Sequence, residues 1–186
     1  MLYQSKLFTE SECDTIKSYV RTLKERSIGT HHPEVNNAKH DTVGGKMIAD
    51  HIQWYISDEY KWFSDKILKW INELNLDRKI SNLGWEFIVC KYVKGDFFKP
   101  HVDDVLADDN ISIKRKRHFT IGIQLSNEIE YQGGKLFVEN TPISQSKGTV
   151  YIFGNNQLHW VDEITEGSRW SCTIFLENDS LKKHLL

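Results

Sequence analysis

The chain has 186 residues, of which 39% are hydrophobic and 27% are charged, the balance of an ordinary globular domain with a full-sized core. Its formal net charge of −2 excludes a global basic field that would recruit nucleic acid. No apolar run reaches the roughly 20 residues that span a bilayer, and the N-terminal residues lack the basic and apolar regions of a signal peptide. The three scattered cysteines form no CxxC pair, so we expect a reduced, cytoplasmic protein.

The first predicted element is a helix. Thr9 and Glu12 form a capping box, in which each side chain accepts a hydrogen bond from a free backbone N–H group of the first turn. The helix is expected to end near Arg26. Apolar residues follow the capping box at helical spacing and predict a buried stripe: Cys13, Ile16, Val20 and Leu23.

Residues 27–46 are predicted to form a long loop because glycine, proline and asparagine recur in them. Its histidines, His31, His32 and His40, have no acidic or cysteine partner at useful spacing, so we interpret them as surface residues. A second helix is predicted at about 49–74. Its large apolar residues recur every three or four positions and are expected to pack on a sheet: Trp54, Trp62, Phe63, Ile67, Trp70, Ile71 and Leu74.

From Trp85 onward the hydrophobic period changes to two, which is typical of strands. Glycine and proline separate the predicted strands, and many short strands with turns between them indicate a sandwich or barrel. We therefore expect one domain over 1–186, with an all-β core at about 84–176 and helical support at about 1–80. The predicted strands are 85–93, 118–126, 135–139, 149–154, 158–162 and 169–176.

An H-x-D motif, His101-Val102-Asp103, carries the first chemical signal. In an extended chain residues i and i+2 point to the same side, so both side chains can bind one ion. With His159 from a later strand they would form the two-histidine, one-carboxylate triad of non-heme Fe(II) oxygenases, which leaves positions for an oxo-acid and O₂. The motif by itself fits a solvated turn equally well.

The last predicted strand places Arg169 on the same face as Ser171, Thr173 and Phe175, a face expected to line the interior. A buried guanidinium is costly unless an anion meets it, and its planar fork suits a carboxylate. An arginine that reaches water from a strand end is the alternative. The opposite face is apolar: Trp170, Cys172, Ile174 and Leu176.

Polar residues also share one face of strand 118–126. If this face lines the interior, Thr120 and Gln124 can hydrogen-bond a polar ligand; otherwise the strand is half exposed. Tyr92 is predicted at the open end of its strand, near His101.

At this point the sequence resembles the prolyl 4-hydroxylase-like 2-oxoglutarate and Fe(II) oxygenases, over roughly residues 84–176. The order and spacing of six motifs carry the resemblance: Y-x-x-G-D-F-F-x-x-H-x-D at 92–103, R-x-x-T at 117–120, G-G-x-L at 133–136, K-G-T-V-Y-I-F at 147–153, H-x-V at 159–161 and G-S-R at 167–169.

The resemblance implies a double-stranded β-helix, a jelly-roll or cupin-like barrel supported by N-terminal helices. It implies that His101, Asp103 and His159 bind Fe(II), and that Arg169 pairs with the distal carboxylate of 2-oxoglutarate. Members often have lysine in place of Arg169.

The resemblance also implies that Tyr92 hydrogen-bonds the co-substrate and that Thr120 and Gln124 line its pocket. Tyrosine is common in members where Gln124 stands, and tryptophan where Phe175 stands. These are the positions at which the sequence departs from the family pattern.

The implied reaction converts 2-oxoglutarate and O₂ to succinate and CO₂ while a C–H bond is hydroxylated, with ascorbate as the expected reductant. Asp103 favours hydroxylation over halogenation, because a carboxylate there blocks the position that halogenating relatives open to chloride. The leading substrate hypothesis is a prolyl residue of a peptide or protein. Loop 104–116 would close over it, with Trp160 and Trp170 at the rim, although the parity of Trp170 also permits packing on the helices.

Three alternatives remain at this point. A free amino acid or other small molecule could be the substrate. Oxidative demethylation of nucleic acid is disfavoured, because the single basic run 114–117 stands against a net negative chain. A non-catalytic cupin-like metal-binding barrel is the third alternative, and Arg169 argues against it because such a barrel needs no anion anchor. No membrane partner is expected.

Overall fold

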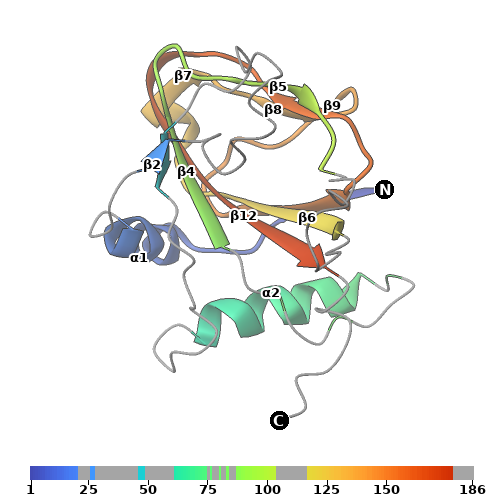
Figure 1. The fold of residues 1–186 in the computed structure, drawn as a ribbon. Helices are drawn as coiled ribbons and strands as arrows, with labels where there is room; N and C mark the ends of the chain where they lie inside the picture. Colours follow the sequence, from blue (N-terminus) through green and yellow to red (C-terminus); the bar gives the residue numbers. More distant parts are fainter. Residues whose placement is uncertain are drawn as a thin grey trace.

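The computed structural model describes residues 1–20, 26–27, 46–48, 61–74, 87–103 and 117–177, together with Leu76, Ile80 and Leu83. In these residues two antiparallel sheets lie one above the other (Figure 1). The larger sheet has the order β1 (Leu2–Lys6), β10 (Thr149–Gly154), β6 (Arg117–Gln124), β12 (Ile164–Glu177), β4 (Phe87–Val93), β3 (Lys46–Ile48) and β2 (Arg26–Ser27). The smaller sheet has the order β5 (Phe98–His101), β11 (His159–Val161), β8 (Leu136–Val138) and β9 (Thr141–Pro142).

Strand β12 connects the architecture. Along its length it pairs with β7 (Tyr131–Gly133), then with β4 on one side and β6 on the other. A short 3₁₀ helix, η2 (Glu128–Glu130), leads into β7. This arrangement confirms the predicted double-stranded β-helix.

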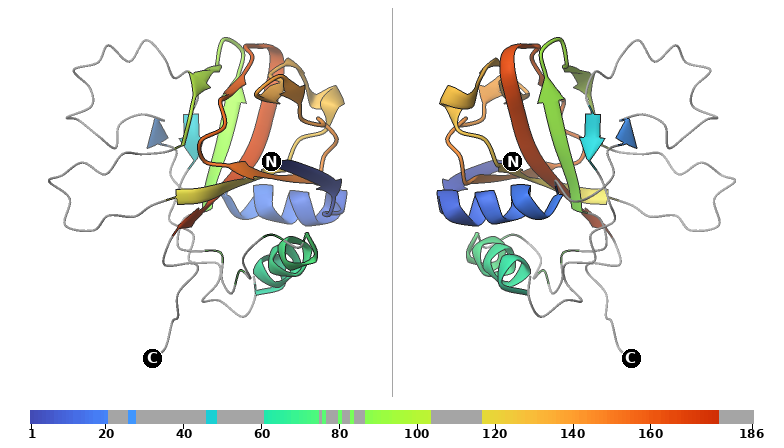
Figure 2. Two further views of the ribbon diagram at one scale, coloured as in Figure 1. Left: turned by 90° about the vertical axis from the view of Figure 1, so that its right-hand side faces the viewer. Right: turned by 90° about the vertical axis from the view of Figure 1, so that its left-hand side faces the viewer.

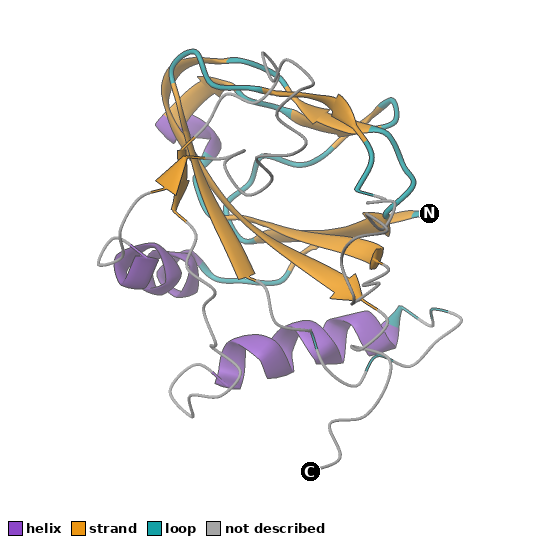
Figure 3. Ribbon diagram, viewed as in Figure 1, coloured by secondary structure: helices purple, strands orange, loops and turns teal. Residues whose placement is uncertain are grey.

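Two helices, α1 (Glu10–Val20) and α2 (Lys61–Glu73), lie below the larger sheet, on the side away from the smaller one (Figures 1–3). The outward face of β12 packs against them, as its alternation predicted, and each fully buried apolar side chain there contributes about 1.5–3 kcal/mol. Trp170 belongs to this core and is 4% exposed, so its predicted place at the substrate rim is wrong. The shared core includes Phe8, Cys13, Ile16, Phe63, Ile67, Ile71, Cys172, Ile174 and Leu176.

The predicted helices are confirmed in part. The backbone N–H of Thr9 donates to Glu12 Oε2 at 2.7 Å and that of Glu12 donates to Thr9 Oγ1 at 3.2 Å, so the capping box forms. Helix α1 does not extend to Arg26, because Arg26–Ser27 pairs with β3 as a strand. Of the second predicted helix, 61–73 is helical and 49–60 lies outside the described residues. The loop predicted at 27–46 is described only at Ser27 and Lys46, which pair with each other in β2 and β3.

The six predicted strands correspond to β4, β6, β8, β10, β11 and β12, with boundaries that differ by a few residues. Sequence periodicity missed β1, β2, β3, β5, β7 and β9. These strands are short and lack a clear alternation, so their pairing partners define them. Strand β1, for example, is mostly exposed and is ordered by β10 through register pairs from Leu2–Phe153 to Lys6–Thr149. None of the helices in the described part of the chain is long and apolar enough to cross a membrane.

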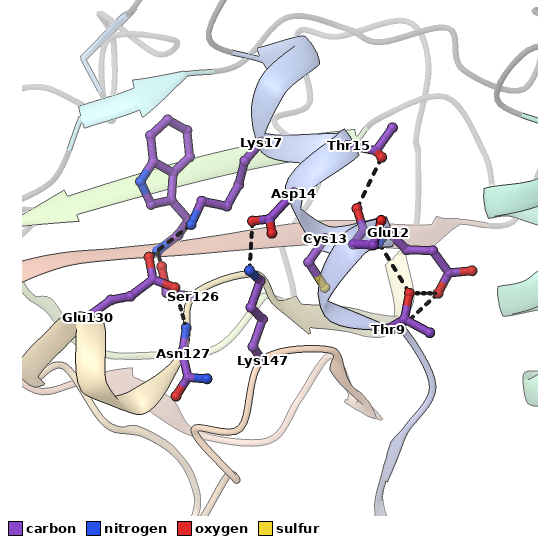
Figure 4. Close-up of polar contacts among 12 residues, drawn as sticks. Thr9, Glu12, Cys13, Asp14, Thr15, Lys17, Ser126, Asn127, Glu130 and Lys147 are labelled. Atoms are coloured by element: carbon purple, nitrogen blue, oxygen red, sulfur yellow. Dashed lines mark hydrogen bonds and ion pairs between the residues drawn. The ribbon is translucent and has the colours of Figure 1, made fainter.

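Helix α1 is also attached to the barrel by two ion pairs with buried lysines (Figure 4). Lys17 Nζ lies 2.9 Å from Glu130 Oε2, and Lys147 Nζ lies 2.6 Å from Asp14 Oδ1. Lys17 and Lys147 are 5% and 6% exposed. Because an unpaired buried ammonium is costly, these pairs fix where α1 sits on the loops that follow β6 and precede β10.

The Lys17–Glu130 pair predicts a pH-dependent contribution to stability. Burial alone would raise the pKa of Glu130. Hydrogen bonds from the Asn127 N–H and from Lys17 lower this pKa by more than burial raises it, so the pKa of Glu130 lies below its ordinary value. The stabilisation is therefore present above the ordinary carboxyl pKa and is lost as the pH falls through the depressed value. We expect Glu130→Gln to lower the free energy of unfolding by about 1–2 kcal/mol at pH 7, between the values for exposed and buried pairs.

Urea unfolding from pH 7 to pH 3 measures this effect, and the difference between wild type and variant should shrink toward acid pH. Glu128→Gln is the matched control, since Glu128 forms no ion pair with any described residue. An equal loss in both variants would contradict the role of the pair.

Candidate metal centre and anion pocket

Three potential metal ligands meet between the sheets. His101 ends β5, Asp103 follows it, and His159 begins β11 directly opposite His101 in the strand register. The ligand atoms of the three side chains all lie within 4.8 Å of one another. Asp103 Oδ1 is 3.7 Å from His101 Nε2, and Asp103 Oδ2 is 3.5 Å from His159 Nε2. One ion fits between such donors, and nitrogen, nitrogen and carboxylate oxygen are a set that Fe(II) accepts.

Backbone carbonyls orient both imidazoles. His101 Nδ1 lies 2.7 Å from the Lys99 carbonyl oxygen, and His159 Nδ1 lies 3.0 Å from that of Gln157. A carbonyl only accepts, so each Nδ1 carries the proton and each Nε2 lone pair is free for a metal. Burial and the neighbouring His159 lower the pKa of His101. The Lys99 carbonyl and Asp103 raise it by less, so the pKa of His101 lies below its ordinary value. The ring is therefore neutral, as a metal ligand must be, at neutral pH.

Hydrogen bonds fix both the backbone and the carboxylate of Asp103. The backbone N–H of Asp103 donates to the Asn155 carbonyl at 2.9 Å, and Thr120 Oγ1 donates to Asp103 Oδ2 at 2.5 Å. Thr120 was expected to line the co-substrate pocket. The structure directs its single hydroxyl proton at Asp103, so that proton is not available to an anion in the pocket.

The second feature is a buried guanidinium without a carboxylate. Arg169 is 3% exposed, on the inner face of β12. Its Nη1 donates to Ser171 Oγ at 3.4 Å, and its Cζ lies 5.6 Å from the centre of the Tyr92 ring, which stands opposite it on β4. No described aspartate or glutamate forms an ion pair with it. An uncompensated buried charge costs several kcal/mol, so this pocket favours an anionic ligand.

Phenols surround this guanidinium. Burial lowers the pKa of Arg169, but Tyr151, Tyr131 and Tyr92 raise it above its ordinary value. Burial raises the pKa of Tyr151 to about 12 despite the opposing charge and hydrogen bond of Arg169, and it raises the pKa of Tyr92 as well. At neutral pH the pocket therefore holds one positive charge among protonated hydroxyl groups, which complements a carboxylate.

Tyr131 and Tyr151 were not identified from the sequence. Tyr151 lies opposite Gly122 in the pairing of β10 with β6, and a Cβ atom at Gly122 would lie 1.9 Å from Tyr151 Cζ. A glycine inside a strand often marks a close approach by another group. That glycine is the one signal in the sequence that could have pointed to Tyr151.

Gln124 is buried, as the interior face of β6 requires, but its amide is already engaged. Gln124 Nε2 donates to the Ser126 carbonyl at 3.2 Å and to Tyr131 Oη at 2.7 Å. Both amide protons are thus used within the protein. The predicted direct hydrogen bond from Gln124 to a co-substrate has no donor left.

The sequence profile of the 2OG-Fe(II) oxygenase superfamily matches residues 87–177. Residues 87–177 thus belong to the 2OG-Fe(II) oxygenase superfamily. This range contains every site residue described above, so the three candidate metal ligands and the pocket around Arg169 lie within the residues that match the family.

Curated relatives that the chain matches include PKHD-type hydroxylases. The protein from Gluconobacter oxydans is 28% identical over 104 residues, 52% of this chain and 46% of that protein. The protein from Idiomarina loihiensis is 29% identical over 85 residues, 44% of this chain and 37% of that one. The chain thus matches these relatives over less than half of their length.

Solved structures share the oxygenase fold at low identity. The viral collagen prolyl hydroxylase from Paramecium Bursaria Chlorella virus-1, as a 2OG complex, has a TM-score of 0.64 at 18% identity, over 95% of this chain and 94% of that one. A Pseudomonas putida prolyl-4-hydroxylase has a TM-score of 0.63 at 16% identity, over 95% and 91%. The Trichoplax adhaerens prolyl hydroxylase, in complex with a hypoxia inducible factor peptide fragment, has a TM-score of 0.66 at 15% identity, over 96% and 84%.

The residues of this oxygenase fit the two groups that its family name implies. The imidazoles of His101 and His159, each with Nδ1 turned to a backbone carbonyl, and the carboxylate of Asp103 suit Fe(II). The unpaired guanidinium of Arg169 suits one carboxylate of 2-oxoglutarate. Aromatic rings pack against the two histidine ligands. The ring centroids of Phe98 and His101 are 4.1 Å apart, and those of Phe153 and His159 are 4.7 Å apart.

The Thr120–Asp103 bond predicts a measurable effect on metal binding. Thr120→Val keeps the shape of the side chain and removes the donor, which leaves Asp103 without its orienting partner. We expect metal affinity to fall by about 10- to 100-fold while the fold is retained. Titration with Mn(II), followed by electron paramagnetic resonance, measures the affinity.

Thr149→Val is the matched control, because Thr149 is a buried threonine on the neighbouring strand β10 whose hydroxyl lies 3.5 Å from Ser144 Oγ. Equal Mn(II) affinities for the Thr120 and Thr149 variants would show that Asp103 does not depend on Thr120.

Proposed function

We propose that this oxygenase hydroxylates a prolyl residue in a peptide or protein, using Fe(II), 2-oxoglutarate and O₂. The observation that carries the proposal is the pairing, within one barrel, of a histidine–aspartate–histidine cluster with a buried guanidinium that has no carboxylate partner. A metal-binding barrel without turnover would need the first feature but not the second. When bound, iron with 2-oxoglutarate and O₂ supplies the oxidising power that converts C–H to C–OH, with succinate and CO₂ released.

In this proposal each site residue has one task. His101, Asp103 and His159 hold the iron, and Arg169 binds the distal carboxylate of 2-oxoglutarate through its planar fork. The ring of Tyr92 packs beside the guanidinium, with its centroid 5.6 Å from Arg169 Cζ. Its hydroxyl group would hydrogen-bond the co-substrate. Ascorbate would keep the iron reduced.

The prolyl substrate is supported by the structural neighbours. The structures with the same fold described above are prolyl hydroxylases, one of them with a bound peptide fragment.

The tryptophans predicted at the rim do not support the substrate hypothesis. Trp160 stacks on Phe137 at a centroid distance of 5.0 Å and donates from Nε1 to Asp162. By strand alternation it faces away from His159 and therefore from the metal. The loop predicted to close over the substrate, 104–116, lies outside the described residues. A single domain over 1–186 and a cytoplasmic location also stay predictions.

Turnover of 2-oxoglutarate tests the reaction class. Succinate formation by the wild type with Fe(II) and ascorbate should be lost in Asp103→Ala. Arg169→Ala should raise the apparent KM for 2-oxoglutarate by about 10- to 150-fold, the effect of losing a charge-assisted bond worth about 1.5–3 kcal/mol. Lys69→Ala is the control, because Lys69 is an exposed cation on α2.

Full activity in Asp103→Ala, or an unchanged KM in Arg169→Ala, would overturn the assignment of these residues. The substrate is tested separately by offering proline-containing peptides and free proline side by side, with detection of a 16 Da mass increase. Hydroxylation of free proline with peptides untouched would replace the peptide substrate by a small molecule and leave the reaction class intact.

A further inference from the structure

A third phenol that influences the charge of Arg169 has no task in the function proposed above. Tyr131 begins β7 and stands opposite Gly167, two residues before Arg169 on β12. Its side chain is 4% exposed and packs in a cluster with Cys90, Tyr92 and Ile164. The side chain therefore lies in the same interior cluster as Tyr92, whose ring faces the guanidinium, and it influences the electrostatics of Arg169.

Two glutamine amides donate to this hydroxyl oxygen. Gln124 Nε2 lies 2.7 Å and Gln145 Nε2 lies 3.2 Å from Tyr131 Oη. Each amide also donates its other proton to a backbone carbonyl, Gln124 to Ser126 at 3.2 Å and Gln145 to Gly133 at 3.1 Å. A carbonyl oxygen only accepts, so these contacts fix both side chains with the NH₂ group toward the phenol.

The two donated protons determine what the phenol can still do. With its oxygen accepting twice, the hydroxyl group can only donate its own proton, and no described residue accepts that proton. Arg169 has no acceptor atom. A ligand oxygen in the pocket is the partner that would satisfy the bond.

We propose that Tyr131 donates a hydrogen bond to the same ligand carboxylate that Arg169 binds, and that Gln124 and Gln145 hold it in this donor state. The inference rests on the proposed function, because the ligand is the distal carboxylate of 2-oxoglutarate. Gln124 is then a positioning residue that acts through Tyr131. This arrangement accounts for a glutamine at position 124, because its amide orients Tyr131 of β7.

The backbone that delivers Tyr131 is fixed from outside the barrel. In the turn η2, Asn127 N–H donates to Glu130 Oε1 at 2.7 Å, and the Asn127 side chain caps the same turn. Lys17 of helix α1 pairs with the other oxygen of Glu130 (Figure 4). The residue directly before Tyr131 is thus attached both to its own turn and to α1, which limits movement of the phenol relative to Arg169.

Calorimetric titration of the Mn(II)-loaded protein with 2-oxoglutarate tests the inference without turnover. Tyr131→Phe keeps the ring and removes the donor, so we expect about 10- to 100-fold weaker 2-oxoglutarate binding with unchanged Mn(II) affinity. Tyr3→Phe is the matched control, because Tyr3 is 40% exposed on the edge strand β1, and its binding should equal that of the wild type. Equal binding by Tyr131→Phe and wild type overturns the inference.

Gln145→Met supplies a second readout that a merely structural role would not produce. It removes one of the two donors to Tyr131 and should weaken 2-oxoglutarate binding by about 3- to 10-fold, the effect of one neutral hydrogen bond. In the Tyr131→Phe background the same change should have no further effect, since no hydroxyl is left to orient. Equal losses of affinity in the wild-type and Tyr131→Phe backgrounds overturn the inference. If Tyr131→Phe does not fold, wild-type affinity in the Gln145→Met variant overturns it. Absence of 2-oxoglutarate binding by the Mn(II)-loaded wild type would instead count against the proposed function.

Discussion

The buried charge of Arg169 is the constraint on which the rest of the site depends. A guanidinium 3% exposed and without a carboxylate partner among the described residues would destabilise the barrel if its surroundings were purely apolar. Instead the centre of the Tyr92 ring lies 5.6 Å from its Cζ atom, Ser171 accepts a hydrogen bond, and the phenols of Tyr131 and Tyr151 contribute to its electrostatic surroundings. These contacts hold the charge in place without neutralising it, which is the state that a carboxylate-binding pocket requires.

The same strand that carries the charge also attaches the barrel to its support. Alternation along β12 turns Arg169 inward and Trp170 outward, so one strand presents an anion pocket on one face and a helix-packing surface on the other. The metal ligands come from elsewhere, at β5 and β11 of the smaller sheet. The site is therefore complete only when both sheets have closed on each other, and the helix core stabilises the sheet that bears the charge.

Alternation and spacing predicted which of these side chains share a face, and the family resemblance implied which of them would bind the metal and the anion. His101 and Asp103 share a face by two-residue spacing, and Arg169 stands on the inner face of its strand by the same rule. Partners across strands could not be predicted in this way. That the hydroxyl of Thr120 bonds Asp103, and that Tyr151 fills the space left by Gly122, depends on the cross-strand register and on loop closure. Gln145, which reaches Tyr131 from the segment between β9 and β10, carries no periodic signal.

A crystal structure of the protein with Mn(II) and 2-oxoglutarate, phased with anomalous data at the manganese edge, is the sharpest test of this site assignment. We expect one manganese peak bonded to His101 Nε2, His159 Nε2 and the Asp103 carboxylate. We also expect the distal carboxylate of 2-oxoglutarate to lie in a bidentate pair with Arg169. A manganese ion bound to other residues, or a 2-oxoglutarate whose distal carboxylate leaves Arg169 without an anion, would contradict it.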